Sequence, residues 1–324
     1  MEKQKGAVEV MERLKIAITG ASGFVGANLV RYFADLHEIY ALTRNSKSWR
    51  LNKEFNQIKF DVKDRQLVRD VLYSLKPDVL IHCATYGGYH FETDTREIIE
   101  TNVLGSMNVL DASKDVSFVI NVGSSSEYGI KNRPMKEGDV AVPVTPYAMS
   151  KALETELFRS AVNSVTLRLF SPYGYYEEKH RLIPYIIYSS IKRQKPILSN
   201  KNSVRDFVFI EDVAEAFSLT IQKFEKIEKG TTFNVGSGVQ MSIEDVIREM
   251  GIKVEWNSSG RAEEPNRKWQ ADITKIKNEL GWEPKNSLGE GLRKTRKWME
   301  RYIELYEVDQ NDKFAGYVRH SDQT

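Results

Sequence analysis

Short apolar runs alternate with segments of helical periodicity through the first two thirds of the chain, and this alternation limits the fold most strongly. The runs are short and end in polar, glycine or proline residues, and we predict strands at 15–19, 38–43, 57–60, 77–83, 117–122 and 164–170. We predict helices at 24–33, 64–75, 93–113 and 145–162. Strands joined by helical crossovers lie parallel. The alternation therefore predicts an α/β fold built on a doubly wound parallel sheet.

The rhythm loosens after residue 172, where a smaller, second α/β domain is predicted. Its predicted helices are 181–193, 211–223, 243–250 and 288–305, and its predicted strands are 206–210 and 232–235. A length of 324 residues suits two domains. We expect an extension at 1–12, a first domain at 13–172, a second mainly at 173–305 and a polar tail at 306–324. Residues 206–236 are expected to cross back to the first domain.

Composition excludes several classes of protein. Lys and Arg number 47 and Asp and Glu number 45, so no net basic field favours nonspecific nucleic-acid binding. Cys83 is the single cysteine, which excludes an intrachain disulfide and a cysteine-rich metal site and fits a reducing, cytoplasmic location. No apolar run approaches the ~20 residues that span a bilayer. The first 13 residues lack the apolar core of a secretory signal, and we expect neither a metal nor a membrane partner.

A glycine-rich turn follows the first predicted strand directly. Glycines allow a tight turn and a close approach of the backbone to a pyrophosphate, while the next helix N-terminus offers free N–H groups. Because the turn lies between a strand and a helix, it predicts a dinucleotide site. The expected contacts are Gly20, Ser22, Gly23, Phe24, Val25 and Gly26.

The ends of the next strands bear on the choice of cofactor. An acidic residue after the second strand is typical of NAD sites, whereas this chain has Thr43 and Arg44 there. A guanidinium pairs with a 2′-phosphate, so Arg44 favours NADP over NAD. Further cofactor contacts are expected at Asp61, which suits the adenine amino group, and at Val62, Cys83, Ala84, Asn102, Tyr147 and Lys151.

Tyr147 and Lys151 lie four residues apart on one predicted helix, so their side chains share a face. A tyrosine titrates near ~10, and a neighbouring ammonium lowers that value toward the range of a general base. Ser124 follows the fifth strand, at the sheet edge where ligands of such folds bind, and is suited to polarise a reacting oxygen. Asn102 is suited to link a water or Lys151 into a proton relay. We expect Ser124, Tyr147 and Lys151 to be catalytic.

The glycine turn, Ser124, Tyr147 and Lys151 together resemble the extended short-chain dehydrogenase/reductase family, in its nucleotide-sugar epimerase, dehydratase and reductase branch. The resemblance runs from about residue 14 to 302 and includes the segments 82–84, 101–103, 168–174, 205–207, 233–238 and 280–282. It implies a Rossmann-like domain that binds the cofactor and a smaller domain that binds a nucleotide-diphosphate sugar. By resemblance, Arg205 and Arg261 contact the phosphates and Glu264 the nucleoside ribose. The sugar is expected near Tyr86, Ser125, Ser126 and Ser171.

The chain departs from this family at several positions. Ser171 replaces a frequent Asn, and Ser125 and Ser126 stand where 4,6-dehydratases carry an acidic pair. Glu127 is one position late for that pair, and a one-residue gap in the alignment would bring it into register. Ser126 also stands where fucose-synthase-type epimerase-reductases carry Cys. His180 lies one residue from the second acid/base of those enzymes.

Together these features predict an NAD(P)-dependent nucleotide-sugar epimerase or 4-keto-sugar reductase that transfers a hydride at carbon 4. A nucleotide-sugar 4,6-dehydratase is the alternative within the same family. A noncatalytic NAD(P)-binding sensor or scaffold is the alternative of another class. We also expect a homodimer formed through the helices near 93–113 and 146–162.

Overall fold

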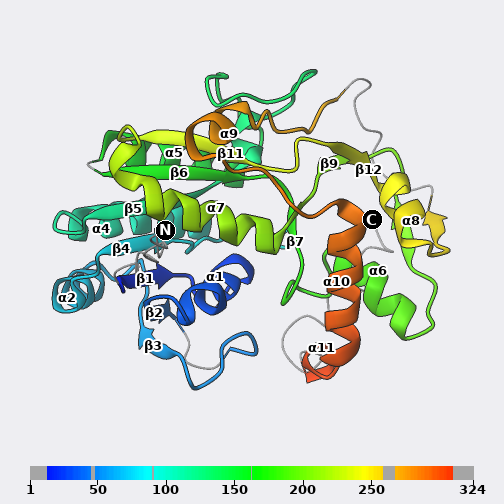
Figure 1. Cartoon of the computed structure of the whole chain (residues 1–324), viewed down its shortest axis with the longest axis horizontal. Helices are drawn as coiled ribbons and strands as arrows, with labels where there is room; N and C mark the ends of the chain where they lie inside the picture. Colours follow the sequence, from blue (N-terminus) through cyan, green and yellow to red (C-terminus); the bar gives the residue numbers. More distant parts are fainter. Residues whose placement is uncertain (1–12, 45–47, 90, 162, 258–266, 309–324) are drawn as a thin grey trace, which may run out of the picture.

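The computed structural model describes residues 13–44, 48–89, 91–161, 163–257 and 267–308. Its centre is a seven-stranded parallel sheet in the order β11-β6-β5-β4-β1-β2-β3 (Figure 1). The strands are β1 Lys15–Thr19, β2 Glu38–Thr43, β3 Asn56–Lys59, β4 Val79–His82, β5 Phe118–Ser124, β6 Ser164–Leu169 and β11 Thr231–Val235. The predicted α/β fold with a Rossmann-like, doubly wound sheet is confirmed.

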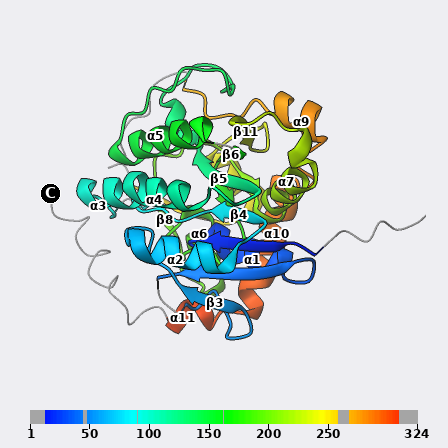
Figure 2. The same ribbon diagram turned by 90° about the vertical axis from the view of Figure 1, so that its left-hand side faces the viewer.

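Helices cover both faces of this sheet (Figure 2). One layer contains α1 Phe24–Ala34 and α7 Ile210–Lys223, and the other contains α2 Arg65–Leu75, α4 Gly105–Ala112 and α5 Pro146–Ser160. Side chains of a strand alternate between faces, so Ile16 and Ile18 pack in the core under α1 and α7. Ala17 between them packs in the core under α2 and α4. The strands are therefore buried on both sides, as their continuous apolar runs require.

The seventh strand comes from far along the sequence. β11 pairs in parallel with β6, with Thr231 opposite Val165 and Val235 opposite Leu169. Helix α9 (Thr274–Leu280), for which no helix was predicted, packs near it. Segments beyond residue 230 thus complete the sheet of the N-terminal half.

The rest of the C-terminal half lies beside the sheet, on the right of Figure 1. In its described residues it contains four helices and three two-stranded sheets, β10 with β7, β12 with β9 and β13 with β8. The helices are α6 Leu182–Ile191, α8 Ile243–Met250, α10 Leu288–Arg301 and α11 Leu305–Val308. The strands are β7 Pro172–Tyr173, β8 Ile197–Ser199, β9 Val204–Asp206, β10 Val208–Phe209, β12 Gln240–Ser242 and β13 Glu255–Asn257. The small-domain boundaries at 172 and 305 stay a prediction.

The helix predicted at 93–113 is interrupted. It consists of α3 Thr95–Ile99, a π-helical turn at Glu100–Leu104 and α4. The turn contains Asn102, which is fully buried and hydrogen-bonds the backbone of Tyr86 through both ends of its amide. A π turn inserts one residue into a helix, and such turns occur often at functional sites. This interruption places the Asn102 amide against the loop that follows β4.

A buried histidine links the central strands to this interrupted helix. His82 Nδ1 lies 2.8 Å from Thr19 Oγ1, and its Nε2 lies 3.0 Å from Ser106 Oγ. The imidazole also stacks on Phe158 of α5. Burial lowers the pKa of His82 to about 3, so the ring is neutral and serves the core. None of the helices in the described ranges is both long and apolar enough to cross a membrane.

Candidate active site

A cavity of about 680 Å³ lies at the carboxyl edge of the sheet. The ends of β1, β4, β5 and β6 form its floor, and residues of the C-terminal half, including Arg181, Arg205 and Trp269, form the facing wall. The strand order changes direction between β1 and β4, and ligands of open α/β sheets bind at such a point. The predicted dinucleotide site and the predicted catalytic residues thus open into one cavity.

The glycine turn fits a backbone cradle for a phosphate. Gly20 has φ +60, and a Cβ there would lie 2.7 Å from the backbone of Ala84. A Cβ at Gly26 would lie 2.5 Å from the Gly20 carbonyl oxygen. The N-cap of α1 is Gly23, so no side chain caps its first N–H groups. The helix N-terminus is therefore open to an anion, and the turn itself admits no side chain at Gly20 or Gly26.

Most of the predicted cofactor contacts line this cavity, and two do not. The lining residues are Gly20, Ser22, Gly23, Phe24, Val25, Gly26, Arg44, Val62, Cys83, Ala84, Tyr147 and Lys151. Asp61 lies outside the lining, and its carboxylate accepts a hydrogen bond from the Lys63 amide. Asn102 lies behind the wall, where its amide donates to Ser150 Oγ at 2.9 Å rather than to Lys151. The residues present fit a dinucleotide.

The three predicted catalytic side chains meet on one wall of the cavity. Ser124 ends β5, whereas Tyr147 and Lys151 lie one turn apart in α5. This helix begins at Pro146, and the Thr145 side chain before it caps the Ala148 amide. Ser124 caps the short turn that follows β5 and shares a hydrogen bond with Ser126 at 2.8 Å. Local capping therefore sets the position of all three residues.

Burial is the main influence on the acidity of Tyr147. Burial raises the pKa of its phenol, while the Lys151 ammonium, the Ser124 side chain and Arg181 each lower the pKa. The result is a pKa above the ordinary value. The sequence predicted the lowering by Lys151, but it carried no measure of how deeply the phenol is buried.

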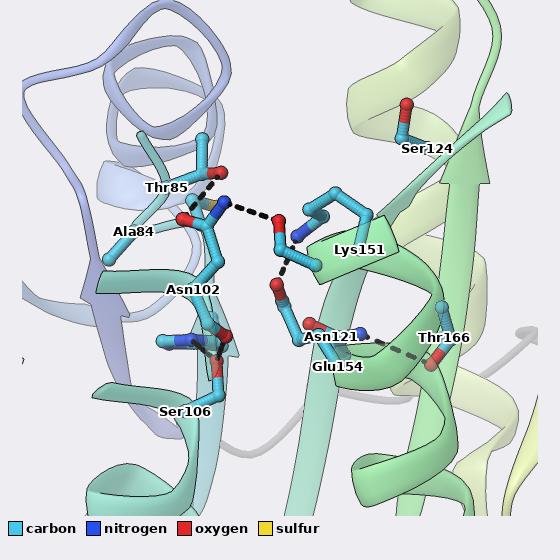
Figure 3. A network of polar contacts seen from close by, with 12 residues as sticks. Ala84, Thr85, Asn102, Ser106, Asn121, Ser124, Lys151, Glu154 and Thr166 are labelled. Carbon is cyan, nitrogen blue, oxygen red and sulfur yellow. Dashed lines mark hydrogen bonds and ion pairs between the residues drawn. The ribbon is translucent and has the colours of Figure 1, made fainter. Parts of the chain in front are cut away.

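Lys151 has a buried acidic partner. Its Nζ donates to Glu154 Oε2 at 2.7 Å, and both side chains are almost fully buried (Figure 3). Burial works against the Lys151 charge, but Glu154, Tyr147 and Glu127 together outweigh burial and raise the pKa of Lys151. The lysine therefore stays an ammonium at the wall of the cavity.

Both carboxylate oxygens of Glu127 are hydrogen-bonded inside the protein. One carboxylate oxygen accepts from the Ser124 amide at 2.7 Å, and the other accepts from Arg168 Nε at 2.7 Å. Its side chain is completely buried and does not line the cavity. Although one gap in the alignment would place Glu127 in the register of a dehydratase acid, its geometry gives it a structural partner instead.

On the substrate side, Ser125, Ser126, Ser171 and Arg205 line the cavity as expected. Tyr86 does not, because the backbone of its loop is held by Asn102 and the later residues Gly88 and Tyr89 reach the wall. Arg261 and Glu264 lie outside the described residues.

Several lining residues were not identified from the sequence. They are Glu92, the segment residues Glu177, Glu178 and Arg181, and Trp269. Arg181 donates to the Gly88 carbonyl at 2.7 Å and lies over the Tyr89 ring. Burial raises the pKa of Glu177 to about 8, so this acid faces the cavity largely uncharged at neutral pH. The acidic pair before Arg181 was a visible signal, but no local pattern directed it toward the cavity.

His180 packs edge-on against the rings of Tyr89 and Phe91 and does not line the cavity. Among the residues that the structure describes, no three His, Cys, Asp or Glu side chains form a group that could hold a metal ion.

A family model described as the NAD dependent epimerase/dehydratase family matches residues 16–236, more than half of the chain. The chain belongs to this family. The match begins in β1 and ends just past β11, so it contains the sheet, the glycine turn and the three residues on the cavity wall. The protein is thus an NAD-dependent enzyme of the epimerase/dehydratase type.

Individual members of the family are distant from the chain but similar over nearly all of its length. A dTDP-glucose 4,6-dehydratase from Haemophilus influenzae is 22% identical and covers 88% of this chain and 97% of its own. A UDP-glucuronate 4-epimerase from Thermodesulfobacterium geofontis is 27% identical, with coverages of 89% and 97%. The crystal structure of the Bordetella bronchiseptica enzyme WbmG with NAD and UDP has a TM-score of 0.78 and 25% identity, with coverages of 90% and 96%.

Proposed function

We propose that the protein is a nucleotide-diphosphate-sugar epimerase or 4-keto-sugar reductase that transfers a hydride at carbon 4 of the sugar. The observation that carries this proposal is the convergence of Ser124, Tyr147 and Lys151 on one wall of the cavity that the glycine turn also lines. Arg205, on the facing wall, is placed for a diphosphate. Both similar enzymes named above act on nucleotide sugars.

Each residue of the wall has a role that its position supports. Tyr147 removes the proton of the sugar hydroxyl, or returns one to the ketone. Ser124 donates a hydrogen bond to the same oxygen, and Lys151 keeps a positive charge beside the phenol. When bound, the nicotinamide supplies the hydride acceptor or donor. Retained cofactor gives epimerisation, because the keto-sugar is reduced again on its other face, whereas exchange with NADPH gives net reduction.

The 4,6-dehydratase alternative requires an acid and a base to remove water across carbons 5 and 6. The dehydratase position holds Ser125 and Ser126, and both oxygens of Glu127 are bound by Ser124 and Arg168. A hydroxyl is a far weaker acid and base than a carboxyl. The described residues thus favour epimerase or reductase chemistry over dehydration.

A sensor or scaffold would have no use for the half-buried Tyr147 beside the buried Lys151. Replacing Tyr147 by Phe separates the two classes, because an enzyme loses turnover but still binds cofactor. We expect the turnover of nucleotide sugars to fall by about 10²–10⁴-fold. Proton NMR of the sugar products measures this turnover. Tyr73→Phe, on the exposed face of α2, is the matched control. Normal turnover by Tyr147→Phe would contradict the mechanism.

NADP preference is proposed on Arg44 alone, which is exposed at the cavity. The family description and the WbmG structure both name NAD instead. Calorimetric titration decides between them. If Arg44 binds a 2′-phosphate, Arg44→Ala weakens NADP binding and leaves NAD binding unchanged. Equal effects on the two cofactors, or tight binding of NAD alone by the wild type, would remove the preference.

The nucleotide contacts Arg261 and Glu264, the homodimer and the cytoplasmic location remain proposals. The homodimer is supported by apolar side chains that are exposed on the π turn, α4 and α5, namely Leu104, Met107, Met149 and Leu153. The location is supported by the single cysteine, Cys83.

A further inference from the structure

The acidic partner of Lys151 belongs to no motif of the sequence. Glu154 lies one turn further along α5, and its Oε2 accepts the hydrogen bond from Lys151 Nζ at 2.7 Å. The Glu154 side chain has 0% exposure and that of Lys151 has 3%. Figure 3 shows the carboxylate below the lysine, on the side away from Ser124.

Tyr147, Lys151 and Glu154 follow one another at spacings of four and three residues, so they form a single stripe on α5. Tyr147 and Lys151 line the cavity, whereas Glu154 does not. The stripe is a row of three ionisable groups that leads from the cavity into the protein interior. Glu154 can therefore act on the reaction only through Lys151 or through its charge.

The charge of Glu154 opposes that of Lys151 at the phenol. Lys151 lowers the pKa of Tyr147, and Glu154 raises it. Charges that are removed from water act on each other strongly because little solvent screens them. A neutral Glu154 would leave the Lys151 charge uncompensated and make Tyr147 more acidic.

Other titratable groups also face the pair. They come from α5, the end of β4 and the turn after β5, namely Tyr147, His82, Cys83 and Glu127. Burial lowers the pKa of His82 to about 3 and raises that of Cys83 to about 12, so both are neutral. Glu127 is balanced by Arg168. Burial raises the pKa of Glu154 to about 7, with Lys151 opposing the rise.

Stability alone is a poor reason for this arrangement. Buried ion pairs are often no more stabilising than apolar residues of similar volume. Within the described residues, Glu154 Oε1 also has no hydrogen-bond partner, which adds an uncompensated desolvation cost. The ion pair therefore adds little to the stability of the fold, which points to a role in holding Lys151 in place.

We propose that Glu154 is a positioning residue for the catalytic pair: it holds the Lys151 ammonium at the cavity wall, and its charge state sets the proton affinity of the Tyr147 phenol. This inference rests on the proposed function, in which Tyr147 transfers the proton. Because Glu154 titrates near neutral pH, the proton affinity of Tyr147 itself varies with pH.

The direct test is the titration of Tyr147 by NMR, with carbon-13 at the phenol carbon of tyrosine and no substrate added. The Tyr147 signal is assigned by its loss in Tyr147→Phe. We expect Glu154→Gln to lower the pKa of Tyr147 by about one unit. Glu156→Gln, at an exposed position on the same helix, should leave the pKa of Tyr147 unchanged. Glu154→Asp, which keeps the carboxylate, should leave the Tyr147 pKa closer to the wild-type value than Glu154→Gln does.

The wild-type protein gives a second measurement that needs no variant to fold. Its Tyr147 signal should shift with an inflection near the pKa of Glu154, before the phenol itself ionises. A Tyr147 titration without that inflection, or one unchanged in a folded Glu154→Gln protein, would overturn the inference.

Activity supplies the third measurement. In the direction of sugar oxidation, kcat/KM rises with pH as the phenol loses its proton. For Glu154→Gln this rise should begin about one pH unit lower than for the wild type. A merely structural role would lower Tm and leave this pH profile in place. If no nucleotide sugar is turned over, the proposed function fails, but the NMR titration still decides the role of Glu154.

Discussion

Glu127 Oε2 and Arg168 Nε lie 2.7 Å apart in a buried ion pair that joins the turn after β5 to β6. The same carboxylate accepts a hydrogen bond from the Ser124 amide, so the pair fixes the residue that we propose faces the reacting oxygen. The Arg168 guanidinium also lies over the ring of Tyr128, which is itself buried.

Arg168→Met should therefore destabilise the protein strongly, because it leaves the Glu127 carboxylate buried without its cation. We expect a loss of about 3–5 kcal/mol in the free energy of unfolding, measured by urea denaturation. Glu283→Gln, which breaks the exposed pair with Lys277, should cost less than about 1 kcal/mol. A similar cost for the two variants would contradict the burial argument.

Gly26→Ala should damage the dinucleotide site. The new Cβ would lie 2.5 Å from the Gly20 carbonyl oxygen and 2.9 Å from Ala21 Cα, so backbone must shift. We expect a loss of about 1–3 kcal/mol in stability and much weaker cofactor binding by calorimetry. Gly138→Ala, where a Cβ meets nothing within 4 Å, is the control. Unchanged cofactor affinity in Gly26→Ala would show that the turn does not hold the phosphates.

Lys151→Met should make Tyr147 a weaker acid, because Lys151 lowers the pKa of the phenol. In sugar oxidation, kcat/KM rises as the phenol loses its proton, so the rise moves to higher pH in the variant. At neutral pH we expect a loss of about 10²–10⁴-fold. The exposed Lys114→Met serves as a control for loss of one positive charge. If kcat/KM of the variant rose at the same pH as in the wild type, Lys151 would not influence the acidity of Tyr147.

His82 should make stability depend on pH in one direction. Its pKa is about 3 in the folded protein and 6.5 ordinarily, so between these values only the unfolded chain binds the proton. The free energy of unfolding attributable to His82 therefore rises with pH through this window, by about 1.4 kcal/mol per unit, and is lost on acidification. Urea denaturation of wild type and His82→Gln should show this slope in the difference between them. If the free energies of unfolding of the two proteins changed with pH in parallel, the low pKa of His82 in the folded protein would be wrong.

Leu104→Glu and Met107→Glu should separate the proposed homodimer into monomers. These side chains are 49% and 45% exposed, Leu153 of α5 is similarly exposed, and a charge there would oppose apolar association. Size-exclusion chromatography with light scattering measures the mass. Tyr73→Glu, which is 71% exposed on α2, should leave the mass unchanged. A wild-type monomer at all concentrations would refute the dimer.

The fold was readable from the sequence because buried parallel strands are continuous apolar runs that local pattern reveals. The π turn was not, since the hydrogen-bond partners of Asn102 in that turn, Tyr86 after β4 and Ser150 in α5, are distant from it in the sequence. The motif residues Tyr147 and Lys151 were found by their spacing. Glu154 was not, because only the burial of its side chain distinguishes it from the exposed Glu156 nearby.

The sequence also suggested a role for Glu127 that its contacts in the structure do not support. Its position near Ser124 suggested an acid, yet its partner Arg168 lies 41 residues away and becomes visible only in three dimensions. Likewise, Arg181 faces the cavity because its guanidinium reaches the Gly88 carbonyl across the two halves of the chain.

The return of β11 to the sheet has a consequence for how the protein is made. During synthesis, the edge of β6 remains unpaired until residues 231–235 have left the ribosome, long after the first six strands. An unpaired edge strand invites association with other chains. A premature stop between residues 169 and 235 therefore leaves β6, an interior strand of the complete sheet, as its exposed edge.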